Sequence, residues 1–149
     1  MKNIIRIFGH SLCGHSQKIE TFLRIIKVAY QFVEIDFNQP QRDLTKYIKR
    51  NLALQIPFIV DGDTIIYDSN TVLVYLARKY APSYIPNNPI FEARVQKFLP
   101  FASSVAALEL TSATLRRKYD SSVNFFLTKA ILTKAFRNLE IHISGKISW

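Results

Sequence analysis

The chain has 149 residues, of which 48% are hydrophobic, and it carries a formal net charge of +9. This length accommodates one ordinary domain or two small ones with a buried core. The chain contains a single cysteine, which cannot form an internal disulfide, so a secreted disulfide-stabilised scaffold is excluded.

Residues 1–6 lack the apolar core of a signal peptide, and no apolar run approaches the roughly 20 residues that span a bilayer. We therefore expect a cytoplasmic protein without membrane contact. The densest basic run is Arg116-Arg117-Lys118, and elsewhere the positive charge is spread along the chain. This distribution favours a solvated surface that attracts anions, so nucleic-acid binding through residues 116–118 is the weakest functional hypothesis. No metal site is expected.

Residues 4–8 predict a buried strand. A helix follows, because apolar residues recur at the i, i+3, i+4, i+7 spacing of one helical face: Ile19, Phe22, Leu23 and Ile26. Residues 32–37 alternate apolar and acidic side chains, which is typical of a half-buried strand. A strand–helix–strand connection of this length predicts a right-handed crossover with parallel pairing. Residues 43–51 predict a short helix.

Residues 55–60 and 64–67 are two apolar runs separated by a turn. The Asp61-Gly62 pair between them predicts a β-hairpin, so these strands should be antiparallel. Asp68-Ser69-Asn70 then supplies the side chains that cap a helix N-terminus. The helix that follows should end near Tyr80 and bury one face: Val72, Leu73 and Leu76.

Three prolines fall within residues 81–89, so residues 82–89 are interpreted as a linker. The pattern beyond the linker is helical. One long helix is expected from Phe91 to Val105, with Pro100 as a kink, and a second from about Ser122 to Ser144. The predicted domains are 1–81 and 90–149.

The segment 11–18 holds Cys13 where the first strand gives way to the first helix. The first N–H groups of a helix have no internal partner, and the helix dipole places partial positive charge there. A thiolate is favoured at such a position. The alternative is a buried, inert cysteine.

The order β-α-β-α-β-β-α, followed by a linker and helices, resembles the glutathione transferase fold. Three segments are similar to this family, two of them to its bacterial members in particular: Gln55-Ile56-Pro57, residues 67–80 (YDSNTVLVYLARKY) and residues 91–98 (FEARVQKF). The resemblance implies an α/β thioredoxin-like N-terminal domain and an all-α C-terminal domain. The chain ends where the family's central helix would begin, so we expect an incomplete helical domain.

The resemblance also implies a glutathione site. Pro57 would be a cis-proline, and the backbone of Ile56 would pair with the tripeptide while Gln55 adds a side-chain contact. Ser69 and the helix start beside it would hold the γ-glutamyl carboxylate, and Asp68 would receive the ammonium. On the other interpretation, Pro57 is an ordinary strand-start proline and Asp68-Ser69 an ordinary cap. Leu52 and Leu54 depart from the family, which has Pro and Gly there.

Cys13-Gly14-His15-Ser16 resembles the CxxS loop of omega-class transferases and chloride intracellular channel proteins, and also that of monothiol glutaredoxins. This implies three uses of Cys13. Cys13 attacks a glutathione mixed disulfide, or the Cys13 thiol or the Ser11 or Ser16 hydroxyl stabilises a bound glutathione thiolate, or Cys13 is inert. His15 is interpreted as a polar loop residue, with a base as the alternative, and Lys18 as solvated.

Glutathione transfer to a small electrophile or disulfide is therefore the first functional hypothesis. Its substrate pocket would lie near Phe98, Phe101 and Val105, although these side chains are equally compatible with a core. The second hypothesis is a non-catalytic module of the same fold that binds a protein partner. The resemblance implies a homodimer through residues 70–78 and 91–97.

Overall fold

The computed structural model describes residues 4–35, 56–101, 103, 130, 133–134, 136–137, 139–141 and 144. The chain divides into two compact units, Met1–Gln96 and Lys97–Trp149. The predicted helix at 43–51 lies outside the described residues. So does much of the predicted helix at 122–144, of which residues 130, 133–134, 136–137 and 139–141 are helical.

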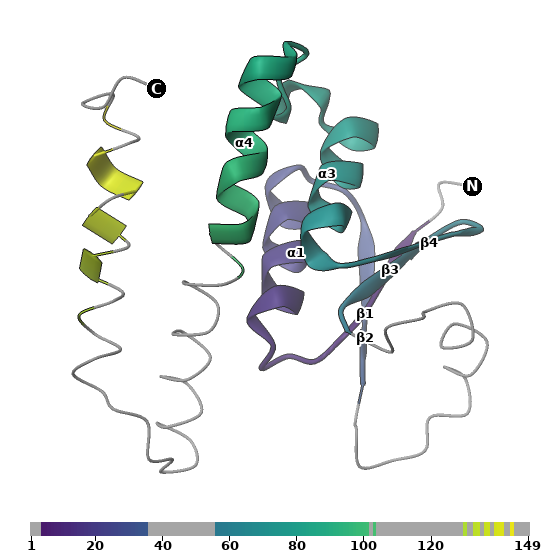
Figure 1. Cartoon of the computed structure of the whole chain (residues 1–149). Helices are drawn as coiled ribbons and strands as arrows, with labels where there is room; N and C mark the ends of the chain where they lie inside the picture. Colours follow the sequence, from purple (N-terminus) through teal and green to yellow (C-terminus); the bar gives the residue numbers. More distant parts are fainter. Residues whose placement is uncertain are drawn as a thin grey trace. The chain divides into compact units, whose positions relative to one another are not determined.

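The first unit is built on a four-stranded sheet with the order β2-β1-β3-β4 (Figure 1). The strands are β1 (Ile5–Gly9), β2 (Tyr30–Glu34), β3 (Phe58–Asp61) and β4 (Thr64–Tyr67). β1 pairs with β2 in parallel, and the other two pairs are antiparallel. The predicted parallel crossover and hairpin are therefore confirmed. β2 begins two residues before the predicted strand.

Glycine makes the tight turn of the hairpin possible. Asp61 is paired with Thr64, so the turn has only two residues, Gly62 and Asp63. Gly62 has a φ of 60°, a left-handed conformation that glycine adopts without steric cost.

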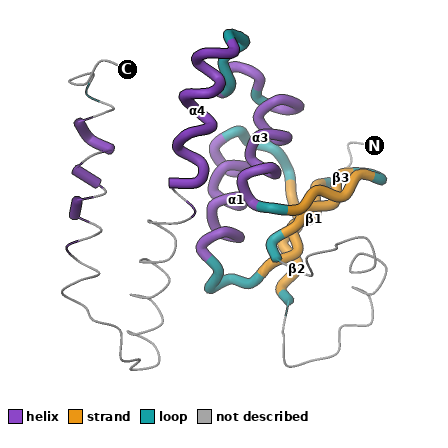
Figure 2. The backbone as a smooth tube through the Cα atoms, in the orientation of Figure 1, coloured by secondary structure: helices purple, strands orange, loops and turns teal. Residues whose placement is uncertain are grey.

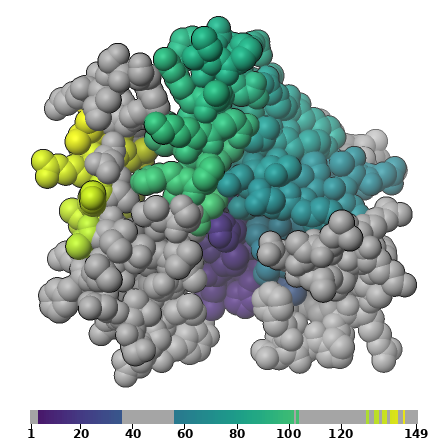
Figure 3. All heavy atoms as spheres, in the orientation of Figure 1, coloured from purple at the N-terminus to yellow at the C-terminus, as the bar shows by residue number. Residues whose placement is uncertain are grey.

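Helices α1 (Gly14–Ile25) and α3 (Ser69–Tyr80) pack together on the sheet (Figure 2). The core between helices and sheet consists of side chains with no solvent exposure: Ile5, Ile7, Ile19, Leu23, Ile59, Val72 and Leu76. The predicted inner faces of both helices are thus confirmed, with Leu73 only half-buried. In the space-filling view, the teal residues that include α3 and the hairpin adjoin the purple residues of the N-terminal part of the chain (Figure 3).

The other face of the sheet is also buried. Phe8, Ile35, Phe58 and Val60 form a second cluster there, in which the Phe8 and Phe58 rings stack with centroids 4.7 Å apart. Because β1 carries buried side chains toward both faces, its sequence is an almost continuous apolar run.

The predicted linker contains a short 3-10 helix, η2 (Pro82–Tyr84), followed by the buried Ile85. Helix α4 (Pro89–Phe101) begins after Asn88, whose side chain accepts hydrogen bonds from the Ile90 and Phe91 N–H groups. Within the described residues, no helix is both long enough and apolar enough to cross a membrane.

Candidate functional site

Cys13 occupies the N-cap position of α1, at the junction of strand and helix that the sequence predicted. Its backbone is extended (φ −88°, ψ 115°), and its side chain makes no capping hydrogen bond. The Cys13 N–H donates to the His10 carbonyl at 2.9 Å, and the Cys13 carbonyl accepts from the Gln17 N–H at 3.0 Å. The side chain is half-buried. The thiol therefore lies at the positive end of a helix with part of its surface exposed.

Ser11 is held by Glu34, which follows in β2. Its N–H donates to both carboxylate oxygens, at 2.9 and 3.1 Å, and its hydroxyl donates to Oε1 at 3.0 Å. A hydroxyl that stabilises a thiolate must donate its only proton to the sulfur. Because Glu34 already receives that proton, the expected catalytic role of Ser11 does not fit the structure.

Ser16 has a structural role as well. It has no solvent exposure, and its Oγ accepts a hydrogen bond from the His10 N–H at 3.3 Å. A Cβ on Gly9 would lie only 2.4 Å from this oxygen, so the end of β1 approaches the first turn of α1 very closely. Ser16 thus joins the end of β1 to the first turn of α1, and its expected catalytic role stays a prediction.

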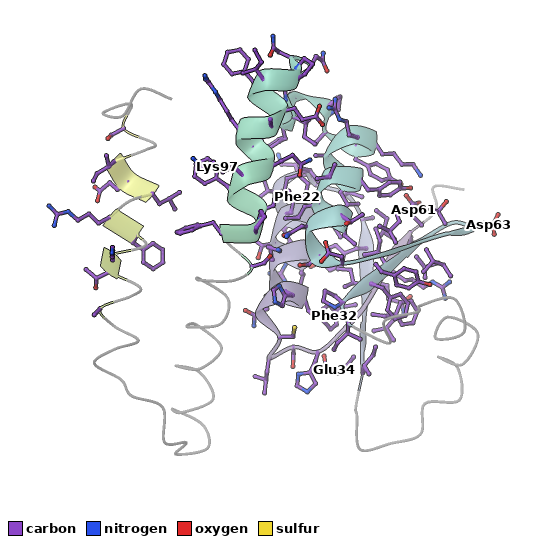
Figure 4. All side chains as sticks on the ribbon, in the orientation of Figure 1. Phe22, Phe32, Glu34, Asp61, Asp63 and Lys97 are labelled. Carbon is purple, nitrogen blue, oxygen red and sulfur yellow. The ribbon has the colours of Figure 1, made fainter. Side chains whose placement is uncertain are left out.

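The rest of the loop is fixed in the same way. The Leu12 N–H donates to His10 Nδ1 at 3.1 Å, and the Gln17 side chain donates to the Ser11 carbonyl at 2.7 Å. His10 Nδ1 also lies 3.7 Å from Glu34 Oε1, but it cannot form that ion pair while it accepts from Leu12. Figure 4 shows Glu34 at this end of the sheet and Asp61 toward the other. The loop that presents Cys13 is therefore held by hydrogen bonds to side chains of β2 and α1.

Asp68 caps α3 through one oxygen. Oδ1 accepts from the Asn70 N–H, the Thr71 N–H and the Thr71 hydroxyl, at 3.0, 2.9 and 3.1 Å. Oδ2 takes part in none of these three bonds. The backbone of Asp68 has a φ of 64° and a ψ of 124°, a sparsely populated combination for a residue with a side chain. Strain of this kind is concentrated at functional sites.

Ser69 and Asn70 join the start of α3 to the first turns of α1. Ser69 Oγ lies 3.2 Å from His15 Nδ1, and Lys18 Nζ donates to Asn70 Oδ1 at 2.6 Å. The interpretation of His15 as a loop residue and of Lys18 as solvated is therefore wrong. Both lie on one face of α1 at i, i+3 spacing, which is the signal in the sequence that they act together.

The environment of His15 and Lys18 lowers the pKa of both side chains and so favours their uncharged forms. Burial lowers the pKa of His15 below its ordinary value, and Lys18 lowers it further, while Asp68 opposes both effects. These effects together favour the neutral form of the imidazole. Burial also lowers the pKa of Lys18, against an opposing effect of Asp68.

The segment before β3 leads directly into the strand that pairs with β1. The Ile56–Pro57 peptide bond is cis, as the resemblance implied, and Pro57 is buried. Phe58 follows directly and pairs with Phe8 of β1. Gln55 lies outside the described residues.

Two of the three residues of the expected substrate pocket lie in the part of the chain that the structure describes. Phe98 and Phe101 are half-buried in α4 and belong to the second unit, whereas Val105 lies outside the described residues. Among the described residues, no group of three or more His, Cys, Asp or Glu side chains could hold a metal ion.

Comparison with known proteins agrees with this fold. The family model "Glutathione S-transferase, N-terminal domain" matches residues 5–78. A probable glutathione S-transferase of Oryza sativa subsp. japonica is 28% identical over 76 residues, which are 51% of this chain and 35% of that protein. Glutathione S-transferase 1 of Triticum aestivum is 25% identical over 76 residues, with 33% of its length covered. The chain thus matches about a third of these relatives.

Solved structures match over more of the chain. A glutathione transferase of Bombyx mori matches with a TM-score of 0.77 at 17% identity, and the match covers 95% of this chain and 67% of the Bombyx mori chain. The theta-class enzyme of Xanthomonas axonopodis pv. citri, solved with glutathione bound, has a TM-score of 0.69 at 23% identity and covers 92% and 67%. The predicted fold class is confirmed: the chain has the glutathione transferase fold, and it belongs through residues 5–78 to the glutathione S-transferase family as an N-terminal domain of that family.

Proposed function

We propose that this chain binds glutathione where α1 and α3 begin, and that Cys13 transfers glutathione to or from a disulfide. The observation that carries the proposal is the contact between Ser69 and His15, because it joins the start of α3, where an anion is favoured, to the helix whose N-cap residue is Cys13. The structural relative from Xanthomonas axonopodis pv. citri, which binds glutathione, supports the choice of ligand.

Each end of glutathione's γ-glutamyl group has a suitable partner. The N-terminus of α3 carries partial positive charge, and the Ser69 hydroxyl lies there beside backbone N–H groups, so a carboxylate is favoured. Asp68 uses Oδ1 for the cap, which leaves Oδ2 for the ligand's ammonium group. The backbone of Ile56, and Gln55 before it, would pair with the rest of the tripeptide.

The loop favours a thiol mechanism over thiolate stabilisation by a hydroxyl. The Ser11 proton is donated to Glu34, and Ser16 is buried, so Cys13 is the reactive group that the loop presents. Its thiolate attacks the glutathione sulfur of a mixed disulfide, forms Cys13–S–SG and releases the other thiolate, which takes up a proton from water. The chain has one cysteine, so a second glutathione thiolate must attack Cys13–S–SG, releasing oxidised glutathione and the Cys13 thiolate.

A non-catalytic interaction module is the second candidate function. Three large apolar side chains are exposed in η2 and at the start of α4: Tyr84 at 54%, Ile90 at 65% and Phe91 at 51%. Apolar side chains that gather on a surface mark interaction sites. A chain with this function would bind glutathione without turning it over, or would show neither glutathione binding nor activity.

An assay with a glutathione mixed disulfide, reduced glutathione and the Cys13→Ser variant tests the proposal. We expect transfer by the unaltered chain, loss of transfer in Cys13→Ser with glutathione binding retained, and activity in Ser11→Ala. Full transfer by Cys13→Ser would rule out the thiol mechanism. Conjugation to an electrophile without disulfide transfer would assign Cys13 to thiolate stabilisation, and binding without either activity would favour the interaction module.

A further inference from the structure

His15 connects the two parts of the proposed glutathione site, which are Cys13 at the start of α1 and Ser69 at the start of α3. It is two residues beyond Cys13, in the first turn of α1, and its Nδ1 is 3.2 Å from Ser69 Oγ. Ser69 is only 4% exposed, and among the described residues His15 is its side-chain hydrogen-bond partner. The direction of this one hydrogen bond determines what the Ser69 hydroxyl can offer to a ligand.

A hydroxyl has one proton and two lone pairs. If Ser69 donates to His15 Nδ1, only lone pairs remain, and they repel the negative oxygens of a carboxylate. If Nδ1–H donates to Ser69, the hydroxyl proton remains available for the carboxylate. A neutral imidazole can adopt either arrangement, since one of its nitrogens carries a proton and the other does not.

The surroundings of His15 favour an anionic ligand. The N-termini of both helices meet here, and the Lys18 ammonium group, which donates to Asn70, lies beside them. Asp68 is the negatively charged group that acts on His15, and its capping oxygen is directed to the start of α3. Each hydrogen-bond donor that points to a carboxylate at the start of α3 therefore strengthens its binding.

We propose that His15 is a positioning residue of the glutathione site: its Nδ1–H donates to Ser69 Oγ and so directs the Ser69 hydroxyl proton to the γ-glutamyl carboxylate. The inference rests on the proposed function and deepens it. His15 would thereby contribute to specificity for the γ-glutamyl end of glutathione. Because His15 belongs to α1, ligand binding at α3 would be linked to the helix that presents the Cys13 thiol.

Calorimetric titration with glutathione tests the proposal through a set of matched variants. The Asn amide nitrogen lies close to the place of His Nδ1, whereas the Gln amide extends toward that of Nε2. We expect His15→Ala and His15→Gln to weaken binding by about 10- to 100-fold, the usual effect of a hydrogen bond to a charged group. His15→Asn should stay within about threefold of the unaltered chain, and Thr21→Ala, on an exposed part of α1, should bind normally.

Two further readouts separate positioning from general support of the fold. In a Ser69→Ala background, His15→Ala should cause no additional loss of affinity, because the hydroxyl that it directs is absent. The ¹⁵N shifts of His15 in the unaltered chain with glutathione bound should show a protonated Nδ1, a measurement that needs no variant.

Several results would overturn the inference. These are unchanged binding by His15→Ala, equal binding by the Asn and Gln variants, additive losses in the double variant, or an unprotonated Nδ1 in the complex. Absence of glutathione binding by the unaltered chain would overturn the proposed function and this inference with it. Normal binding by the unaltered chain together with any of the four results overturns this inference alone.

Discussion

At the scale of single residues, Gly9 shows how closely the site is packed. A Cβ at this position would lie 2.4 Å from Ser16 Oγ and 2.9 Å from Ser16 Cβ, distances that no relaxed structure contains. The absent side chain at Gly9 allows the strand to end against the first turn of α1, where Ser16 accepts from the His10 N–H.

Gly9→Ala should lower the free energy of unfolding by about 1–3 kcal/mol, the usual cost of overpacking. Urea denaturation measures this change. In a Ser16→Ala background the same substitution should cost less, because the closest contact involves the hydroxyl oxygen. Equal costs in the two backgrounds would show that the contact is not the cause.

Asp68→Asn should separate the two roles of Asp68. Asn retains a capping oxygen and tolerates a positive φ, so unfolding should change by no more than about 0.5 kcal/mol. Glutathione affinity should fall about tenfold or more, because the charge that receives the ammonium is lost. Thermal unfolding and calorimetric titration measure the two quantities, and unchanged affinity would remove Asp68 from the ligand site.

At the scale of elements, Asp61 fastens the hairpin to α3. Its buried Oδ2 accepts from Tyr75, Lys79 and Tyr80 at 2.8, 2.7 and 2.6 Å. Burial alone would raise the pKa of Asp61, but the hydrogen bonds from Lys79, Tyr80 and Tyr75 together lower it below the usual value. The carboxylate is therefore more acidic in the folded chain than in the unfolded one.

This pKa shift makes stability depend on pH. The contribution of Asp61 is fully present above its unfolded pKa of about 4 and is lost as the pH falls through the lower folded value. Asp61→Asn should lower the free energy of unfolding by about 1–3 kcal/mol at pH 7 and by less in acid. Asp63→Asn, in the exposed turn of the same hairpin, is the matched control. A pH-independent difference between Asp61→Asn and the unaltered chain would contradict this account.

The elements were predictable where the pattern of apolar residues decides them. The apolar runs of β3 and β4, the glycine turn between them and the inner faces of α1 and α3 all follow from local sequence. The contacts of the site do not, because Ser69 and His15 are 54 positions apart and Ser11 and Glu34 are 23 apart. These pairs depend on the register of β1 against β2 and on how α1 packs on α3, which one sequence does not disclose. Sequence analysis therefore proposed Asp68 and Ser69 as site residues, which stays a prediction, and it did not anticipate that Glu34 accepts the Ser11 proton.

At the scale of the whole molecule, association remains a prediction. The resemblance implies a homodimer through residues 70–78 and 91–97, and Phe91, in the second of these ranges, is 51% exposed. Sedimentation velocity should give about twice the 17.2 kDa of one chain, and Phe91→Glu should reduce it to that of a monomer. A monomeric unaltered chain would show that these residues do not join two copies.

Glutathione binding by the 149-residue chain tests the central claim most directly. Calorimetric titration of the unaltered chain should show saturable binding that is lost when Asp68 and Ser69 are both replaced by Ala and retained in Cys13→Ser. No binding up to about 10 mM glutathione, roughly tenfold above the upper end of common KM values, would contradict the account. So would binding that is unchanged in the double variant.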